Sequence, residues 1–341
     1  MEAVVRVTHW QGEKQRVGGT LYIRGIAACR RTGSRAVDHA TVVEAIFASE
    51  TSAIVTPRPV VEAATARRLR DAFEPLSMHA VWSPLVHERL SAEGLDFFGT
   101  YVLGRGCVLG RPSGRVVAAA FAAFEPGMIA GIWDGAIAVV GVDEGRRLTF
   151  DATAESLALV LEGADSAAIE SVAARLSETV DGLDPTGRPL FAGVQSLAWH
   201  DDPYGRLWQA CLALREHRGD AHVAAYIGEG FDPVRMNILT ELWLDYPVGE
   251  YSGTRAWPEE ATVAATAQLR ADGLIDEGDV ITRRGTEVRD AIEARTDQME
   301  QAVVDALGAD LDDIVTQLSE WSARCVEART FPPDPRKRAA G

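Results

Sequence analysis

The chain has 341 residues, an apolar fraction of 47% and a formal net charge of −16. This length favours two domains, and the apolar fraction excludes a globally disordered protein. The acidic balance disfavours general binding to nucleic acid or to acidic membranes. No apolar run reaches the ~18 residues of a membrane span, and the N-terminus lacks a signal-peptide pattern. We therefore expect a cytoplasmic protein.

The cysteines give no sign of a disulfide framework or a metal site. Cys29, Cys107, Cys211 and Cys325 lie far apart and form no CxxC pair. Such spacing is typical of reduced thiols buried in a cytosolic protein. We predict no set of metal-binding residues, and the sequence does not identify a cofactor.

Residues 1–58 differ from the rest of the chain. They carry eight basic residues against five acidic ones, although the whole chain is strongly acidic. Their apolar residues follow no sustained period, so the pattern favours a poorly ordered extension or an overlong gene start. A small genuine subdomain is the alternative.

Residues 59–195 are expected to form a glycine-rich helical domain. The predicted helices cover residues 61–73, 84–93 and 115–124 and two stretches within 151–181. Pro75 is expected to end the first of them. The apolar run AIAVVGV, which begins at residue 136, predicts a short strand.

Residues 196–325 are expected to form a second helical domain, followed by a basic flexible tail over 326–341. Asp202-Pro203 and Asp232-Pro233 each combine an N-cap residue with a proline at the first helical position. Between them, Gly219 fits a C-cap and Asp220 an N-cap. This pattern predicts three helices joined by tight turns over residues 203–244.

The next segment has the order of a winged helix. Trp257-Pro258 opens a helix that Gly273 ends, and Leu274-Ile275 reads as a short strand. A tight acidic turn over 276–279 leads to the returning strand Val280-Ile281, and Thr282 caps the last helix. The sequence therefore predicts a winged helix-turn-helix with its wing at 276–279.

Two resemblances support this interpretation. Over residues 255–298, ADGLID…DVITRRGTEVRDAIEART resembles the wing of the MarR family of regulators. Over about 60–325, the runs EPLSMHAVWSP, GTYVLGRGCVLG, VVAAAFAAFEP, GRPLFAG and LREHRGDAHVAAYI resemble an actinobacterial family of unassigned function that contains a helix-turn-helix. The resemblance implies a mainly α, two-lobed fold with a C-terminal winged helix-turn-helix, and it implies no activity. Residues 1–58 have no place in it.

The charge of the winged-helix segment argues against DNA as its partner. A recognition helix needs basic and amide side chains on its exposed face, but the candidate over 258–271 offers Glu259, Glu260, Gln268 and Arg270. Residues 255–298 contain six arginines and ten acidic residues. DNA binding is therefore disfavoured, and a winged helix used for packing or interaction is preferred.

A run of ionisable residues in an apolar region marks the candidate site. It comprises Arg215, Glu216, His217, Arg218, Asp220 and His222. One interpretation is structural, with Gly219 and Asp220 as caps and the charges as ordinary ion pairs. Another is a pocket for an organic ligand, and a third is a metal site, although the spacing matches no zinc signature.

His79 and Arg105 complete the candidate ligand-binding set. His79 lies in a helix-ending loop, and Arg105 stands among glycines, where it could hold an anion or cap a helix. The leading hypothesis is a cytoplasmic winged-helix protein that binds a small ligand or a partner, as a regulator of transcription. The alternative is an enzyme with a pocket between the lobes built on His79, His217, Asp220 and His222. The oligomeric state is left open, with a homodimer as one option.

Overall fold

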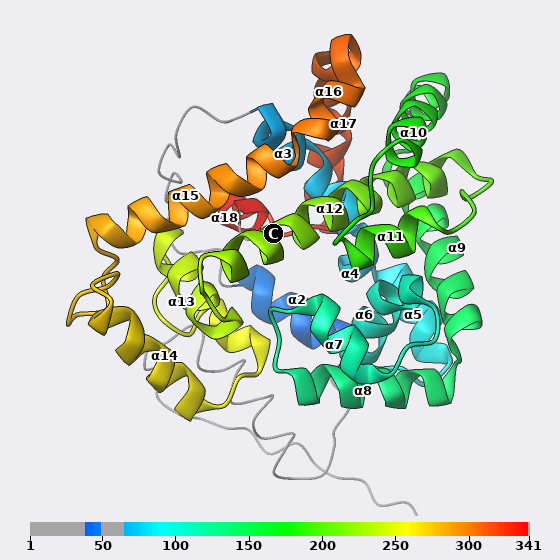
Figure 1. Cartoon of the computed structure of the whole chain (residues 1–341). Helices are drawn as coiled ribbons and strands as arrows, with labels where there is room; N and C mark the ends of the chain where they lie inside the picture. Colours follow the sequence, from blue (N-terminus) through cyan, green and yellow to red (C-terminus); the bar gives the residue numbers. More distant parts are fainter. Residues whose placement is uncertain (1–37, 49–64, 340–341) are drawn as a thin grey trace, which may run out of the picture.

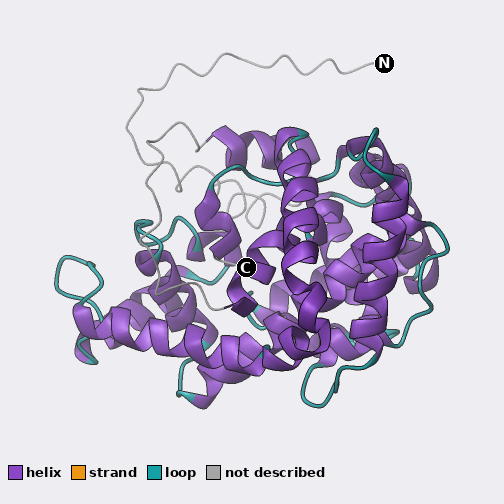
Figure 2. Cartoon of the chain, turned by 90° about the horizontal axis from the view of Figure 1, so that it is seen from above, coloured by secondary structure: helices purple, strands orange, loops and turns teal. Residues whose placement is uncertain are grey.

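The structure, a computed structural model of the chain, describes residues 38–48 and 65–339. Within these ranges the chain forms helices joined by short connections, with no strand (Figure 2). The one β-type contact in this part is an isolated antiparallel bridge between Ile275 and Ile281. The mainly α class predicted from the sequence is confirmed.

The helices vary in length, and α12 is the longest of those described. Their bounds are α2 (His39–Ala48), α3 (Thr65–Ser77), α4 (His79–Trp82), α5 (Pro84–Ala92), α6 (Phe97–Gly106), α7 (Gly114–Phe121), α8 (Pro126–Val139), α9 (Val142–Val160), α10 (Ser166–Asp181), α11 (Pro189–Gln195), α12 (Pro203–Gly228), α13 (Pro233–Trp243), α14 (Glu259–Ala271), α15 (Arg283–Met299), α16 (Gln301–Leu307), α17 (Leu311–Glu327) and α18 (Pro335–Ala339). Short 3-10 turns are η2 (Cys107–Leu109), η3 (Ser252–Arg255) and η4 (Gly308–Asp310).

Helix α12 runs through the middle of the molecule (Figure 1). Its first turn is fixed by Asp202, whose side chain accepts the N–H groups of Tyr204 and Gly205, and by Pro203. Helices α3, α9, α10, α11 and α15 all pack against it. A helix covered on most sides buries residues around its whole circumference, and α12 does so.

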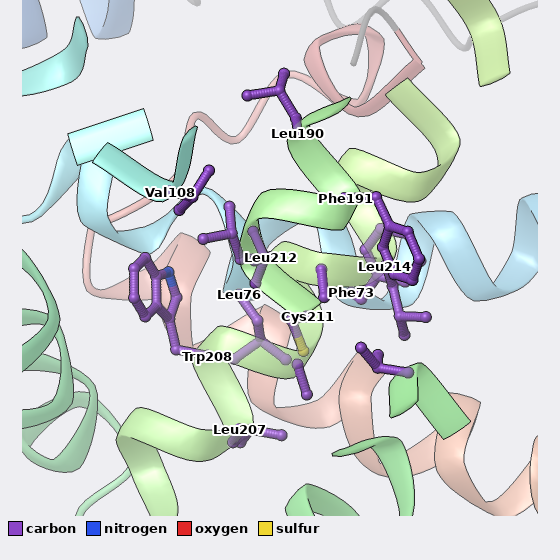
Figure 3. Close-up of a cluster of buried hydrophobic side chains, with 14 of the residues drawn as sticks. Phe73, Leu76, Val108, Leu190, Phe191, Leu207, Trp208, Cys211, Leu212 and Leu214 are labelled. Carbon is purple, nitrogen blue, oxygen red and sulfur yellow. The ribbon is translucent and has the colours of Figure 1, made fainter. Parts of the chain in front are cut away.

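The main hydrophobic core lies along the first half of α12 (Figure 3). Trp208, Cys211 and Leu212 pack there with Phe73 and Leu76 of α3. The indole N–H of Trp208 donates to the carbonyl of Ser77 at 3.1 Å, so the ring is buried without an unpaired donor. The core continues into α17, which packs against α3.

A smaller hydrophobic cluster holds α13 and α14 together. It joins α13, α14 and the following turn through Ile238, Leu239, Leu269 and Ile275. The chain turns back after α14 and is held by the hydrogen bonds Asp276 N–H to Val280 O and Thr282 N–H to Leu274 O, both 2.9 Å. A Cβ at Gly285 would lie 2.1 Å from the carbonyl oxygen of Leu274, so this close approach requires glycine.

Several local predictions were wrong because packing overrode local preference. Helix α12 continues through Gly219, where two separate helices were predicted. A mid-helix glycine costs only about 1 kcal/mol, which the burial of the surrounding turns offsets. The run that begins at Ala136 lies in α8 and α9 instead of a strand, and the helices part at Gly141, where φ is +82°. Pro75 lies inside α3, two residues before its end.

Both ends of the described chain contain buried side chains. Helix α2 belongs to the segment expected to be poorly ordered, yet Val42 and Phe47 are buried, and the ring of Phe47 lies edge-on to Trp82. The rest of residues 1–58 lies outside the described residues. Near the other end Phe331 is buried, and Arg336 pairs with Asp334 at 2.8 Å. The predicted domain boundaries and the mobility of the tail stay predictions.

Among the described residues, no single helix has the length and apolar composition needed to cross a membrane. The consecutive helices α8 and α9 pass that test only as a pair, and they are bent by 91° relative to each other.

Candidate functional site

A cavity of about 290 Å³ lies beside the second half of α12. Its volume is near the lower end of the roughly 300–1,000 Å³ typical of small-molecule sites. Aromatic side chains form much of the wall: Trp82, Phe97, Phe98, Tyr101, Phe121, Phe124, Tyr226, Tyr251 and Phe331. Such a wall suits a ligand with a flat, apolar body.

Helical spacing places one face of α12 on the cavity. Arg215, Gly219, His222 and Tyr226 recur every three or four residues, and all four line the space. Glu216, His217, Arg218 and Asp220 lie on the other faces and are not among the lining residues. The ionisable run is therefore divided by the continuous helix into a cavity face and a packing face.

The wall opposite α12 comes from segments far apart in the sequence. Tyr101 and Arg105 stand one turn apart on α6, and Met236 and Asn237 come from α13. The connection between α13 and α14 adds further lining residues, including Tyr251 and Arg255. The cavity thus lies between the main core and the segment of α13 and the connection that follows it.

Arg105 and Arg215 are held by buried carboxylates. Arg105 makes a two-pronged ion pair with Glu216, with both N–O distances 2.8 Å. Arg215 contacts Glu74 and Glu216, both at 3.2 Å. Burial raises the pKa of Glu216, but Arg105 and Arg215 outweigh this and hold it below its ordinary value. Glu216 and the two arginines therefore stay charged, and the arginines are fixed at the cavity wall.

His222 contributes a neutral imidazole to the cavity. Its Nδ1 lies 3.1 Å from the hydroxyl of Thr296, and its ring lies edge-on to Tyr226. Burial, reinforced by the charge of Arg289, lowers the pKa of His222 to about 3. The ring is therefore uncharged at neutral pH and can exchange hydrogen bonds with a ligand without carrying charge.

A buried charge cluster joins α12 to α3 and α15. Arg218 donates to Glu293 at 2.9 Å and to Asp297 at 2.8 Å. Arg67 reaches Asp297 at 2.6 Å, and Arg289 reaches Glu293 at 2.6 Å. Because breaking one partner of a buried pair leaves an uncompensated charge, this cluster fixes α15 against α12. Arg218 therefore holds helices together and does not face the cavity.

The remaining predicted site residues are dispersed. His79 is buried against Ser156, at 2.9 Å, and burial lowers its pKa to about 3. His217 lies 2.8 Å from Glu300. Asp220 accepts the N–H groups of Leu190 and Phe191, both at 3.0 Å. It thus caps α11 and not, as predicted, a helix of its own.

These positions do not support a single catalytic pocket. Of His79, His217, Asp220 and His222, only His222 lines the cavity. Among the described residues, no group of three or more histidine, cysteine, aspartate or glutamate side chains is arranged to hold a metal ion. The pocket built from all four residues, which the enzyme alternative needed, is therefore not formed.

Sequence reasoning missed most of the cavity wall. The spacing of Phe97, Tyr101 and Arg105 on one helix face was an available signal. No signal in the sequence marks Arg255 or Lys337 as a cavity residue, because only the tertiary fold brings these two positions to the cavity. Trp82 also lines the cavity.

Fold and site together define a mainly helical protein in which α13 and the connection to α14 form one wall of an aromatic cavity. The chain belongs to a helix-turn-helix family, whose model matches residues 66–332. This match confirms the helix-turn-helix expected from the sequence. No curated protein and no solved structure matches the chain.

Proposed function

We propose that this protein is a cytoplasmic regulator that binds a small organic molecule in the cavity beside α12. The observation that carries the proposal is the aromatic cavity, which has fixed charges from Arg105 and Arg215 and a neutral imidazole from His222. In a small-molecule site, the wall is mostly apolar and a small number of polar groups that point into it orient the ligand.

The cavity wall links ligand binding to the helix-turn-helix. Asn237 of α13 and Trp257, just before α14, both donate to the carbonyl of Ala123, at 2.9 and 3.0 Å. Glu241 of α13 is fully buried and accepts the N–H groups of Gly249, Tyr251 and Ser252 at 2.7–2.9 Å. Because the same segments line the cavity, a ligand contacts elements that position α13 relative to α14.

We further propose that residues 233–299 are a winged helix whose wing is reduced to the Ile275–Ile281 bridge. The order α13, α14, hairpin turn and α15 supports this, as does the short acidic turn after Ile275. Its role is packing or contact with a partner. The exposed face of α14 carries Glu259, Glu260 and Val263, and Arg270 pairs with Asp279. A helix that repels phosphate is a poor recognition helix.

The test uses N-phenyl-1-naphthylamine, a neutral aromatic dye that fluoresces when it enters an apolar site. We expect the dye to bind with one site per chain, and we expect Gly219→Phe to abolish binding because the new ring fills the space beside α12. Near-ultraviolet circular dichroism checks that the variant is folded. Dye binding that is unchanged in the folded variant would place the site elsewhere and refute the proposal.

The regulatory half of the proposal has its own measurement. Amide hydrogen exchange with and without the dye should show slower exchange in residues 233–256, since these line the cavity and carry the buried Glu241 contacts. Protection confined to α6 and α12 would mean that the cavity binds a ligand without acting on the helix-turn-helix.

A further inference from the structure

The cations of the cavity wall fall into two groups. Arg105, Arg215 and Arg289 each pair with a buried carboxylate. Arg255 and Lys337 also line the cavity, but no carboxylate of the described residues lies within 4 Å of either charged group. The first group forms close ion pairs with carboxylates of the protein, whereas within the described residues the second group does not.

Arg255 is held by aromatic rings in place of an acid. Its guanidinium lies over Tyr251 at 4.3 Å and over Phe124 at 4.7 Å from the ring centres. Its Nε atom is buried and has no hydrogen-bond partner among the described residues. A buried donor of a charged group without an acceptor costs free energy, so the unfilled hydrogen bond points to an acceptor that the described residues do not supply.

Lys337 is brought to the same region by the C-terminal segment. Asp334 accepts the hydroxyl of Tyr246 at 2.7 Å and pairs with Arg336, which fixes the start of α18. The ammonium of Lys337 then lies 5.1 Å from the ring centre of Tyr246. Burial lowers the pKa of Lys337, while the carboxylates of Asp334 and Glu250 oppose this shift and Arg255 adds to it. The positive charge of Arg255 therefore disfavours the charged form of Lys337.

Glu250 is the acidic side chain on this part of the wall. It lines the cavity but forms no ion pair with Arg255 or Lys337. One carboxylate at longer range offsets part of the field of two cations and leaves their hydrogen-bond donors available. A ligand anion can approach the two donors while its body rests on the aromatic wall.

We propose that the ligand is an aromatic or similarly flat apolar molecule with one anionic group, and that Arg255 and Lys337 bind this group. The inference rests on the proposed function of the cavity and names the chemical class of its ligand. Phe124 and Tyr251 hold the guanidinium of Arg255 in place. Because this cation selects for an anionic group, Arg255 is a specificity-determining residue. An uncharged molecule of the same shape fills the same space but leaves the two donors unpaired.

The experiment compares two dyes that differ in one charged group. 8-Anilinonaphthalene-1-sulfonate carries a sulfonate that N-phenyl-1-naphthylamine lacks. We expect Arg255→Gln and Lys337→Gln each to lower the ratio of sulfonate-dye affinity to neutral-dye affinity by about tenfold, the effect of losing one charge-assisted contact. Affinity for the neutral dye should change less than about twofold, since neither variant replaces an aromatic side chain of the cavity wall.

Arg283→Gln is the matched control. Its side chain is 92% exposed and pairs with Glu287 on the surface, so it removes one positive charge away from the cavity. The affinity ratio should stay unchanged in this variant. Equal losses of both dyes in Arg255→Gln and Lys337→Gln, or an unchanged ratio, would overturn the anion site while leaving the cavity as a ligand site. Failure of both dyes to bind the wild type would overturn the proposed function as well.

Discussion

A small substitution at Gly219 should change the stability of α12 without preventing ligand binding in the cavity. Gly219 lies in the interior of a 26-residue helix, where glycine costs about 1 kcal/mol relative to alanine. A Cβ built at this position would meet only the carboxylate of Glu216, at the ordinary contact distance of 3.7 Å. Gly219→Ala should therefore stabilise the protein by about 1 kcal/mol, because helix propensity improves and no packing is lost.

The assay is urea unfolding followed by far-ultraviolet circular dichroism. The free energy of unfolding should rise in Gly219→Ala, and the neutral dye should still bind. Gly205 in the same helix is the matched control, since its Cβ would lie 2.4 Å from the ring of His200. Gly205→Ala should destabilise by roughly 1–3 kcal/mol, as overpacking does. A loss of stability in Gly219→Ala comparable to that in Gly205→Ala would refute the reasoning, because it would show that the space beside Gly219 is filled.

Three further predictions concern groups outside the cavity. Burial raises the pKa of Asp220 to about 7. Between pH 4 and pH 7 this side chain therefore ionises in the unfolded chain but stays largely protonated in the folded protein. The free energy of unfolding should fall by up to about 4 kcal/mol over this range. Asp220→Asn keeps an acceptor for α11, so urea unfolding should find it more stable than the wild type at pH 7.5 but not at pH 4, and a less stable variant at pH 7.5 would contradict the shift. Arg218→Met leaves Glu293 and Asp297 undercompensated and should cost about 3–5 kcal/mol in the same assay, whereas Arg283→Met should cost less than about 0.5 kcal/mol. Deletion of residues 1–58 removes α2 with its buried Val42 and Phe47, so the melting temperature should fall by several degrees, and an unchanged value would show that the segment is dispensable, as the sequence favoured.

The predictions from sequence that held concern local chemistry. Asp202-Pro203, Asp232-Pro233 and Thr282 each begin a helix, and the side chains of Asp202, Asp232 and Thr282 accept N–H groups of the first turn. A cap depends on residues within one turn of each other, so the sequence contains all that determines it. The same holds for Gly273, where φ is +70° and α14 has ended.

The features that were missed depend on contacts between distant segments. Gly219-Asp220 has the composition of a break between helices, but the carboxylate of Asp220 binds the start of α11, thirty residues upstream. Without knowing that α11 lies there, the local interpretation was the better one. The ionisable run lies in an apolar helix, where charges need buried partners. Which of them face a cavity depended on the continuity of α12.

Arg289 connects the cavity to α13. It lines the cavity from α15, donates to Glu293 at 2.6 Å and to the hydroxyl of Thr240 in α13 at 3.1 Å, and lies over the ring of Trp243. It is 1% exposed, so it cannot change its contacts without disturbing both helices. The charge cluster that contains Glu293 fixes α15 to α12 and α3 on the other side. Under the proposed function, a ligand that contacts Arg289 would act on α13 against a rigid support, and a change in α13 and α14 on binding requires such an arrangement.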